Sequence, residues 1–121
     1  MVRAVFDTNV LIDYLNGVSE AGAEIGRYDQ GFISVLTWME VMVGAAAPVA
    51  AGTEAFLSGF GLIPVDEAVA RRAVAVRQKH RMKVPDAIIW ATALVNNMLL
   101  VTRNTKDFPL DDPGVRMPYR R

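Results

Sequence analysis

The sequence predicts an α/β fold with a mainly parallel central sheet of four to five strands. Short apolar runs alternate along the chain with longer stretches of helical pattern, which is typical of strand–helix–strand units. The chain has 121 residues, a length that suits one domain over residues 1–121. A hydrophobic fraction of 52% beside a charged fraction of 21% indicates a globular chain and excludes a disordered one.

Each predicted strand is a short apolar run. Residues 2–6 read as a buried strand, whereas residues 62–65 contain Pro64, which cannot donate to a sheet ladder and is expected at an edge. A last short strand at 115–117 would bring the number to five. The predicted strands cover residues 2–6, 31–33, 62–65, 98–101 and 115–117.

The predicted helices begin at capping residues or at a proline. Ser19, Ser34 and Asp66 are expected to cap helices, because short polar side chains accept from the free N–H groups of a first turn. Pro48 should end the third helix, and Pro85 should open the last one. The predicted helices cover residues 9–16, 19–28, 35–47, 49–58, 66–82 and 86–96.

Four acids far apart in the sequence are expected on one rim of this fold. Asp7 ends the first strand, Glu40 lies in the second turn of the helix after the second strand, and Asp86 lies in the first turn of its helix. Asp107 follows the strand at 98–101 after a short turn. Ligands of open parallel sheets bind beyond the carboxyl ends of the strands, where the following helices also begin.

Carboxylates brought together at such a rim predict a metal site. They repel one another and are partly desolvated, so one or more would take up a proton unless a cation neutralises them. Mg²⁺ and Mn²⁺ are the usual cations for an all-oxygen site, and next to a phosphodiester they support hydrolysis. Each acid also has a structural alternative: Asp7 as a helix cap, Glu40 on a solvated stripe, Asp86 at a helix dipole, Asp107 in a turn.

Four uncharged polar residues are expected to support this rim. Asn9 can hold the turn after Asp7 or a substrate oxygen, and Thr37 shares the helix face of Glu40. Thr102 and Asn104 can orient a water molecule or a phosphate oxygen, although turns favour these residue types in any case.

Two other titratable residues are not expected at the site. Asp13 reads as a solvated helix residue. His80 falls on the apolar side of its helix and reads as a core or edge histidine rather than a ligand.

The formal charge is zero, but its distribution is uneven. Residues 1–70 carry nine acids and two bases, whereas residues 71–121 carry eleven bases and four acids. The run 71–83 holds six bases and no acid, and Arg72, Lys79 and Lys83 share one edge of its helix. Such a strip can bind a polyanion such as RNA, and a solvated helix face explains it equally well.

The composition also indicates in which cellular compartment the protein acts. There is no cysteine, which excludes disulfides and thiolate zinc sites and favours a reducing cytoplasm. The longest apolar stretch, residues 41–52, is too short to span a bilayer, so no membrane association is expected. Asp7 lies where a signal peptide would need its apolar centre, and we therefore expect no export signal.

Four stretches of the chain resemble the PIN-domain family, and within it the VapC-type toxins of bacterial toxin–antitoxin pairs. They read VFDTNVLID, SVLTWMEV, PDAIIWATA and VTRNTKDF, and they start at Val5, Ser34, Pro85 and Val101. They occur in the family's order and span nearly the whole chain. The resemblance implies a three-layer α/β/α fold.

The resemblance also implies a metal-dependent endoribonuclease. Asp7, Glu40 and Asp86 match the family's metal ligands, and Asp107 matches its fourth and most variable acidic position. Thr102 and Asn104 match supporting polar positions, which brings the matching set to six residues. The family implies one or two Mg²⁺ or Mn²⁺ ions and a metal-activated water that attacks an RNA phosphodiester in line.

Two kinds of protein partner follow from the same resemblance. The family implies a homodimer, and a cognate antitoxin whose C-terminal segment lies in an apolar groove near the site and blocks it. The chain would then be the toxin of a type II toxin–antitoxin system. The alternative is a catalytically inactive PIN fold that binds RNA or protein, and the intact set of acids argues against it.

Overall fold

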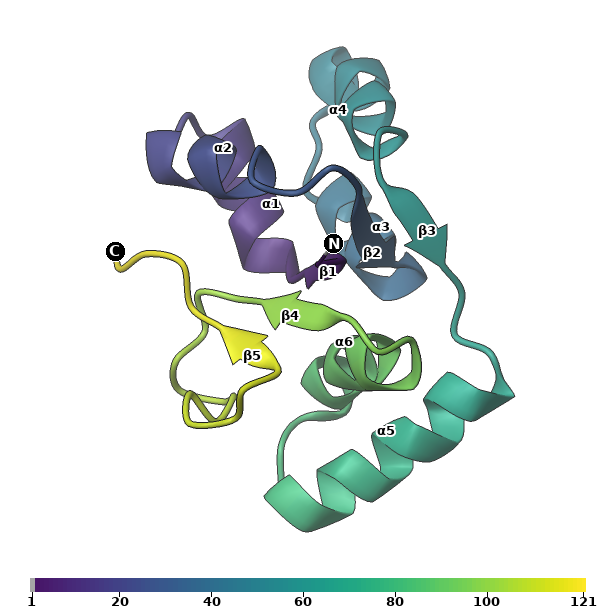
Figure 1. Ribbon diagram of the computed structural model, residues 1–121. Helices are drawn as coiled ribbons and strands as arrows, with labels where there is room; N and C mark the ends of the chain where they lie inside the picture. Colours follow the sequence, from purple (N-terminus) through teal and green to yellow (C-terminus); the bar gives the residue numbers. More distant parts are fainter. Residues whose placement is uncertain (1) are drawn as a thin grey trace.

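The computed structural model describes residues 2–121 and contains a five-stranded sheet in the order β3-β2-β1-β4-β5. All four strand pairings are parallel, which confirms the predicted sheet (Figure 1). The edge position of β3, which Pro64 follows, is confirmed as well. The strands are β1 (Ala4–Phe6), β2 (Gly31–Ser34), β3 (Gly61–Ile63), β4 (Leu99–Val101) and β5 (Val115–Arg116).

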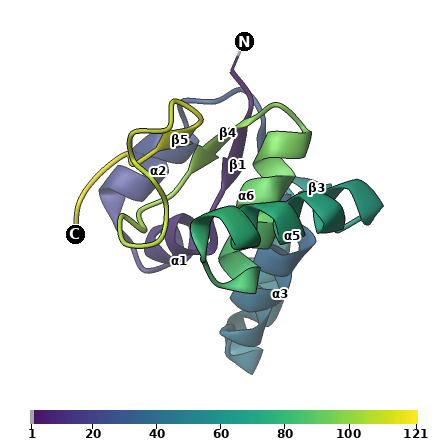
Figure 2. The ribbon, with the colours of Figure 1, turned by 90° about the horizontal axis from the view of Figure 1, so that it is seen from below.

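Helices cover both faces of the sheet, which makes three layers (Figures 1 and 2). In β1, Val5 belongs to the core beneath α5 and α6, whereas Ala4 and Phe6 belong to the core beneath α1 to α4. Successive strand residues point to opposite faces, so one strand joins both cores. The helices are α1 (Thr8–Leu15), α2 (Ser19–Ile25), α3 (Val35–Val43), α4 (Ala50–Leu57), α5 (Glu67–His80), α6 (Val84–Val95) and the 3₁₀ turn η1 (Ala47–Val49).

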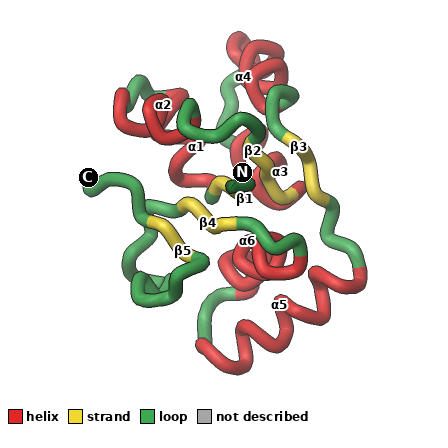
Figure 3. Tube along the Cα trace, in the orientation of Figure 1, coloured by secondary structure: helices red, strands yellow, loops and turns green. Residues whose placement is uncertain are grey.

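Helix α6 lies at the centre of its layer, between the sheet and α5 (Figure 3). Six of its residues are buried, as expected for a helix that is apolar nearly all round. Pro85 occupies its first turn, where the missing N–H leaves no hydrogen bond unmade. Asp86 directly precedes Ala87, the first of these buried residues.

The third helix is shorter than predicted. It ends at Val43 instead of residue 47, and the chain is extended at Ala46 before Pro48 enters η1. Gly44 weakens the helix, and Pro48 has no N–H for the carbonyl of Gly44 and would clash with it in a continued helix, so the chain leaves the helix early.

The capping predictions divide into two outcomes. Ser34 accepts from the N–H of Leu36, and Asp66 accepts from the N–H of Val69, as predicted. Ser19 does not cap α2, because it is the first helical residue and Val18 holds the cap position without a side-chain hydrogen bond. Residues 2–121 include no helix long and apolar enough to cross a membrane.

Candidate active site at the carboxyl edge of the sheet

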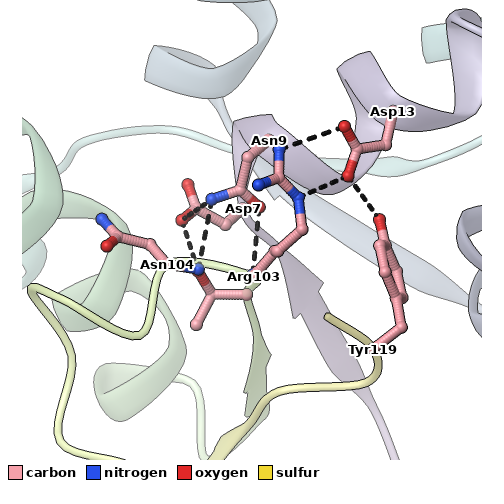
Figure 4. Close-up of polar contacts among 7 residues, drawn as sticks. Asp7, Asn9, Asp13, Arg103, Asn104 and Tyr119 are labelled. Carbon is pink, nitrogen blue, oxygen red and sulfur yellow. Dashed lines mark hydrogen bonds and ion pairs between the residues drawn. The ribbon is translucent and has the colours of Figure 1, made fainter. Parts of the chain in front are cut away.

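Asp7 lies at the centre of the candidate site, directly after β1. Its side chain is 3% exposed, and the N–H of Thr8 donates to its Oδ1 at 2.7 Å. The Thr102 hydroxyl and the Asn9 amide donate to its Oδ2 at 2.7 and 3.2 Å (Figure 4). Asp7 is also the cap of α1, so the structural and the functional readings of this residue are compatible.

Thr102 connects the ends of two neighbouring strands. It follows β4, which pairs with β1, and it is fully buried. Its hydroxyl donates to Asp7 and accepts from the N–H of Asn104 at 3.0 Å. The turn after β4 is therefore fixed relative to the Asp7 carboxylate.

Glu40 reaches the same edge from α3. The Thr8 hydroxyl donates to its Oε1 at 2.6 Å and lies 3.1 Å from the hydroxyl of the buried Thr37. Although Glu40 stands among apolar residues in the sequence, it is exposed. Of the helix only Thr37 and Val41 are buried, and Met39 and Val43 are exposed like Glu40, so this carboxylate stays at the solvent edge where its charge is not costly.

Asp86 and Asp107 complete the predicted set. Asp86 is half-buried in the first turn of α6, and Asp107 is exposed in the segment after β4. The Asn104 amide donates to Asp107 at 2.9 Å. All four acids thus come from segments at the carboxyl ends of β1, β2 and β4 or from the start of α6.

The acids influence one another electrostatically. Burial raises the pKa of Asp7 to about 6, and the charges of Asp86 and Glu40 add to the rise, while hydrogen bonds from Thr102 and Thr8 oppose it. Burial also raises the pKa of Asp86, together with the charges of Asp107 and Glu40. Lys83 is the cation that opposes this second rise.

The raised pKa values fit a site for a divalent cation, although the side chains are not arranged as a complete coordination site. Within residues 2–121, no three acids or histidines are gathered closely enough to hold a metal ion as they stand. Glu40 is bonded to Thr8 and Asp107 to Asn104. Carboxylates whose pKa values rise through burial and mutual repulsion are nevertheless the donor set that a hard cation neutralises.

A second buried acid beside the site was missed from the sequence. Asp13 is 5% exposed, so its prediction as a solvated residue was wrong. Arg103 donates to its two oxygens at 2.6 and 3.1 Å, and the Tyr119 hydroxyl donates at 2.7 Å (Figure 4). Nothing around Asp13 in the sequence reveals partners that lie 90 and 106 residues away.

This cluster also supports the site itself. The backbone N–H of Arg103 donates to Asn9 at 3.1 Å, and Asn9 in turn contacts Asp7. A signal for Arg103 existed, because it lies between the supporting residues Thr102 and Asn104.

The three predicted RNA-binding cations do not line a basic cleft that the sequence did not reveal, although Lys83 lies close enough to Asp86 to lower its pKa. Arg72, Lys79 and Lys83 are exposed on or just after α5. The cleft has a volume of about 490 Å³ and opens beside the site. Its lining residues are Asn9, Arg103, Asn104, Thr105, Lys106, Met117, Arg120 and Arg121.

Comparison with known proteins agrees with this architecture. Residues 4–110 match the PIN domain model. The chain is 32% identical to ribonuclease VapC19 of Mycobacterium tuberculosis, over 95% of this chain and 98% of that protein. It is 47% identical to a chain of a toxin–antitoxin complex from Klebsiella pneumoniae, with a TM-score of 0.92 and coverage of 98% and 99% of the two chains.

A more distant solved structure shares the fold alone. VapBC2 from Rickettsia felis, bound to a DNA fragment from its promoter, is 18% identical with a TM-score of 0.75 and coverage of 94% and 96%. The PIN domain family model matches most of the chain, and the sheet order and the acidic edge agree with it. The chain therefore belongs to the PIN-domain family.

Proposed function

We propose that this chain is a metal-dependent endoribonuclease and the toxin of a type II toxin–antitoxin pair. One observation carries the proposal: Asp7 is almost fully buried, and its pKa is raised to about 6 beside carboxylates from other elements. Strongly perturbed acids gathered at one edge are typical of catalytic sites. The similarity to VapC19, which is named a ribonuclease, supports the choice of RNA as the substrate.

Asp7, Glu40 and Asp86, with Asp107 as the fourth acid, would hold one or two Mg²⁺ or Mn²⁺ ions. When bound, such an ion neutralises the acids, polarises the phosphate and lowers the pKa of a bound water molecule. The chain's own residues orient the acids: Thr8 and Thr102 hold Asp7, Thr8 also holds Glu40, and Asn104 holds Asp107. These four contacts orient three of the four carboxylates before a substrate arrives.

The proposed partner is an antitoxin, as in the similar toxin–antitoxin complex from Klebsiella pneumoniae. A groove of about 760 Å³ offers a place for an apolar segment of it. Its lining comes from α1 and from the segment after α3, with Ile12 and Leu15 on one element and Pro48 and Val49 on the other. A homodimer and action in the cytoplasm stay predictions of the sequence.

The experiment is cleavage of total cellular RNA by the purified chain with Mg²⁺, with Mn²⁺ and with EDTA. Asp7→Asn is expected to lower the rate on the order of 10³-fold, because several kcal/mol of transition-state stabilisation depends on the metal. Asp111→Asn, an exposed aspartate in the segment before β5, is the matched control and should cleave as the wild type does.

The outcomes separate the proposal from its alternative. Cleavage that needs both the metal and Asp7 supports the nuclease. RNA binding without cleavage at any metal concentration would favour an inactive PIN fold that serves as a binding module. Cleavage that persists in Asp7→Asn would contradict the assigned site.

A further inference from the structure

The basic cleft beside the acids has a composition that the catalytic proposal does not use. Four of its lining residues are cations, namely Arg103, Lys106, Arg120 and Arg121, and none is an acid. Asn9 and Asn104 also line it, and these two contact Asp7 and Asp107. The cleft therefore begins where the acidic edge ends.

Three of the four cations are available to a ligand. The Arg103 guanidinium is bonded to both oxygens of Asp13, so its charge is already compensated. Lys106, Arg120 and Arg121 are exposed, and no ion pair to any of them occurs among residues 2–121. Unpaired cations around a concave surface attract anions and hold them by charge-assisted hydrogen bonds.

The segment that carries Arg120 and Arg121 is anchored to the body of the protein. The Tyr119 hydroxyl donates to Asp13 at 2.7 Å, and its ring packs against the core beneath α1 (Figure 4). Just before it, β5 pairs with β4, and the N–H of Thr102 donates to the carbonyl of Arg116. Since the backbone is fixed at Tyr119, the two arginines that follow it reach the cleft from a fixed point, and binding costs less entropy than on a free tail.

We propose that this cleft binds backbone phosphates of the RNA strand next to the phosphodiester that is cut. The inference rests on the proposed nuclease function and adds to it a binding site made by Lys106, Arg120 and Arg121. It assigns RNA guidance to this cleft rather than to the strip on α5. Because phosphate contacts carry no base information, the cleft sets the path of the strand and not the sequence preference.

The test measures the salt dependence of RNA binding. All variants are made in the Asp7→Asn background, so that a fluorescent single-stranded oligonucleotide is not cut during the measurement. Loss of two phosphate contacts should flatten the slope of log K against log salt by about 1.4, since each contact contributes about 0.7 for single strands. We expect this change for Arg120→Gln/Arg121→Gln, and about half of it for Lys106→Gln.

Arg71→Gln/Arg77→Gln is the matched control, because it also replaces two arginines by glutamine, at exposed positions on α5. Its slope should equal that of the parent. Melting temperatures of all variants check that the fold is retained.

Three results would overturn the inference. Equal slopes for the two double variants would show that the cleft cations do not contact phosphate, and a larger change in the control would transfer the role to α5. Displacement of the oligonucleotide by polyglutamate at equal charge would indicate a site for acidic protein segments. Each of these results leaves the cleavage assay unaffected, so the nuclease proposal can stand or fail separately.

Discussion

Asp7 and Asp13 are two buried carboxylates in the same strand–helix segment, yet their surroundings are opposite (Figure 4). Around Asp7 the donors are uncharged, and the nearby charges are the carboxylates of Asp86 and Glu40. Around Asp13 the donors are the Arg103 guanidinium and the Tyr119 hydroxyl. The pKa of Asp7 is raised to about 6, whereas that of Asp13 is lowered.

The arrangement at Asp13 occurs a second time. Glu24 is 4% exposed, Arg116 donates to both of its oxygens, and Tyr28 donates at 2.9 Å. Burial raises the pKa of Glu24, but these partners outweigh it and the net shift is downward. Acids with a structural role thus receive an arginine, while the acids at the candidate site are left without one and suit a cation that arrives from solution.

Breaking the ion pair between Arg103 and Asp13 should have the largest effect on the free energy of unfolding. Asp13→Asn leaves the Arg103 guanidinium without its charge partner and weakens the attachment of the Tyr119 segment. Since Arg103 is 32% exposed, we expect a loss of about 2–3 kcal/mol, somewhat below the loss for a fully buried pair. Urea denaturation at neutral pH measures this loss, and an unchanged midpoint would mean that the ion pair does not stabilise the fold.

Removing the charge of Asp7 should act in the opposite direction. In EDTA at pH 7, Asp7→Asn is expected to raise the free energy of unfolding by about 1–3 kcal/mol, because the wild-type carboxylate is ionised against a raised pKa. The same denaturation experiment reports it. A destabilised variant would show that the hydrogen bonds to the carboxylate outweigh the cost of its burial and the repulsion from Asp86 and Glu40.

The pH profile of stability should therefore have two limbs in metal-free solution. The folded pKa of Asp7 is raised from 3.8 to about 6. Its protonation therefore stabilises the folded protein fully below about pH 3.8, and this stabilisation is lost as the pH rises through about 6. The lowered pKa values of Asp13 and Glu24 stabilise the folded protein at pH values above the ordinary pKa of a carboxyl group. This stabilisation is lost as the pH falls through their folded pKa values.

Stability should accordingly rise between pH 7 and about 5 and fall again at lower pH. Denaturation at a series of pH values traces both limbs. Asp7→Asn should reduce the rise between pH 7 and about 5, to which the raised pKa of Asp86 also contributes. Asp13→Asn should reduce the fall at lower pH. A profile that neither variant alters would refute the assignment.

The smallest effect is expected for an exposed ion pair. Arg71 and Glu67 lie 2.8 Å apart on α5, and both side chains are 78% exposed. Arg71→Gln should change the free energy of unfolding by less than about 0.5 kcal/mol. A loss as large as that of Asp13→Asn would mean that burial is not what separates the two kinds of pair.

Much of the fold is readable in the sequence because local patterns encode it. The alternation of apolar runs and helical patterns predicted the parallel sheet, and Pro64 predicted its edge strand. The helix ends were less accurate: α3 stops before Pro48 instead of at it, since the chain leaves the helix at Gly44. Helix ends depend on capping and packing around a few residues, and the apolar period does not record them.

The sequence by itself determined which acids could meet, because strand ends and helix starts at one edge of a parallel sheet follow from the order of the elements. Only the tertiary structure decided which acids receive an arginine. The partners of Asp13 and Glu24 lie about 90 residues or more away in the chain, except for Arg27 and Tyr28, which follow Glu24 within about one turn. The same holds for the basic cleft, whose cations come from two segments that the pairing of β4 with β5 brings together.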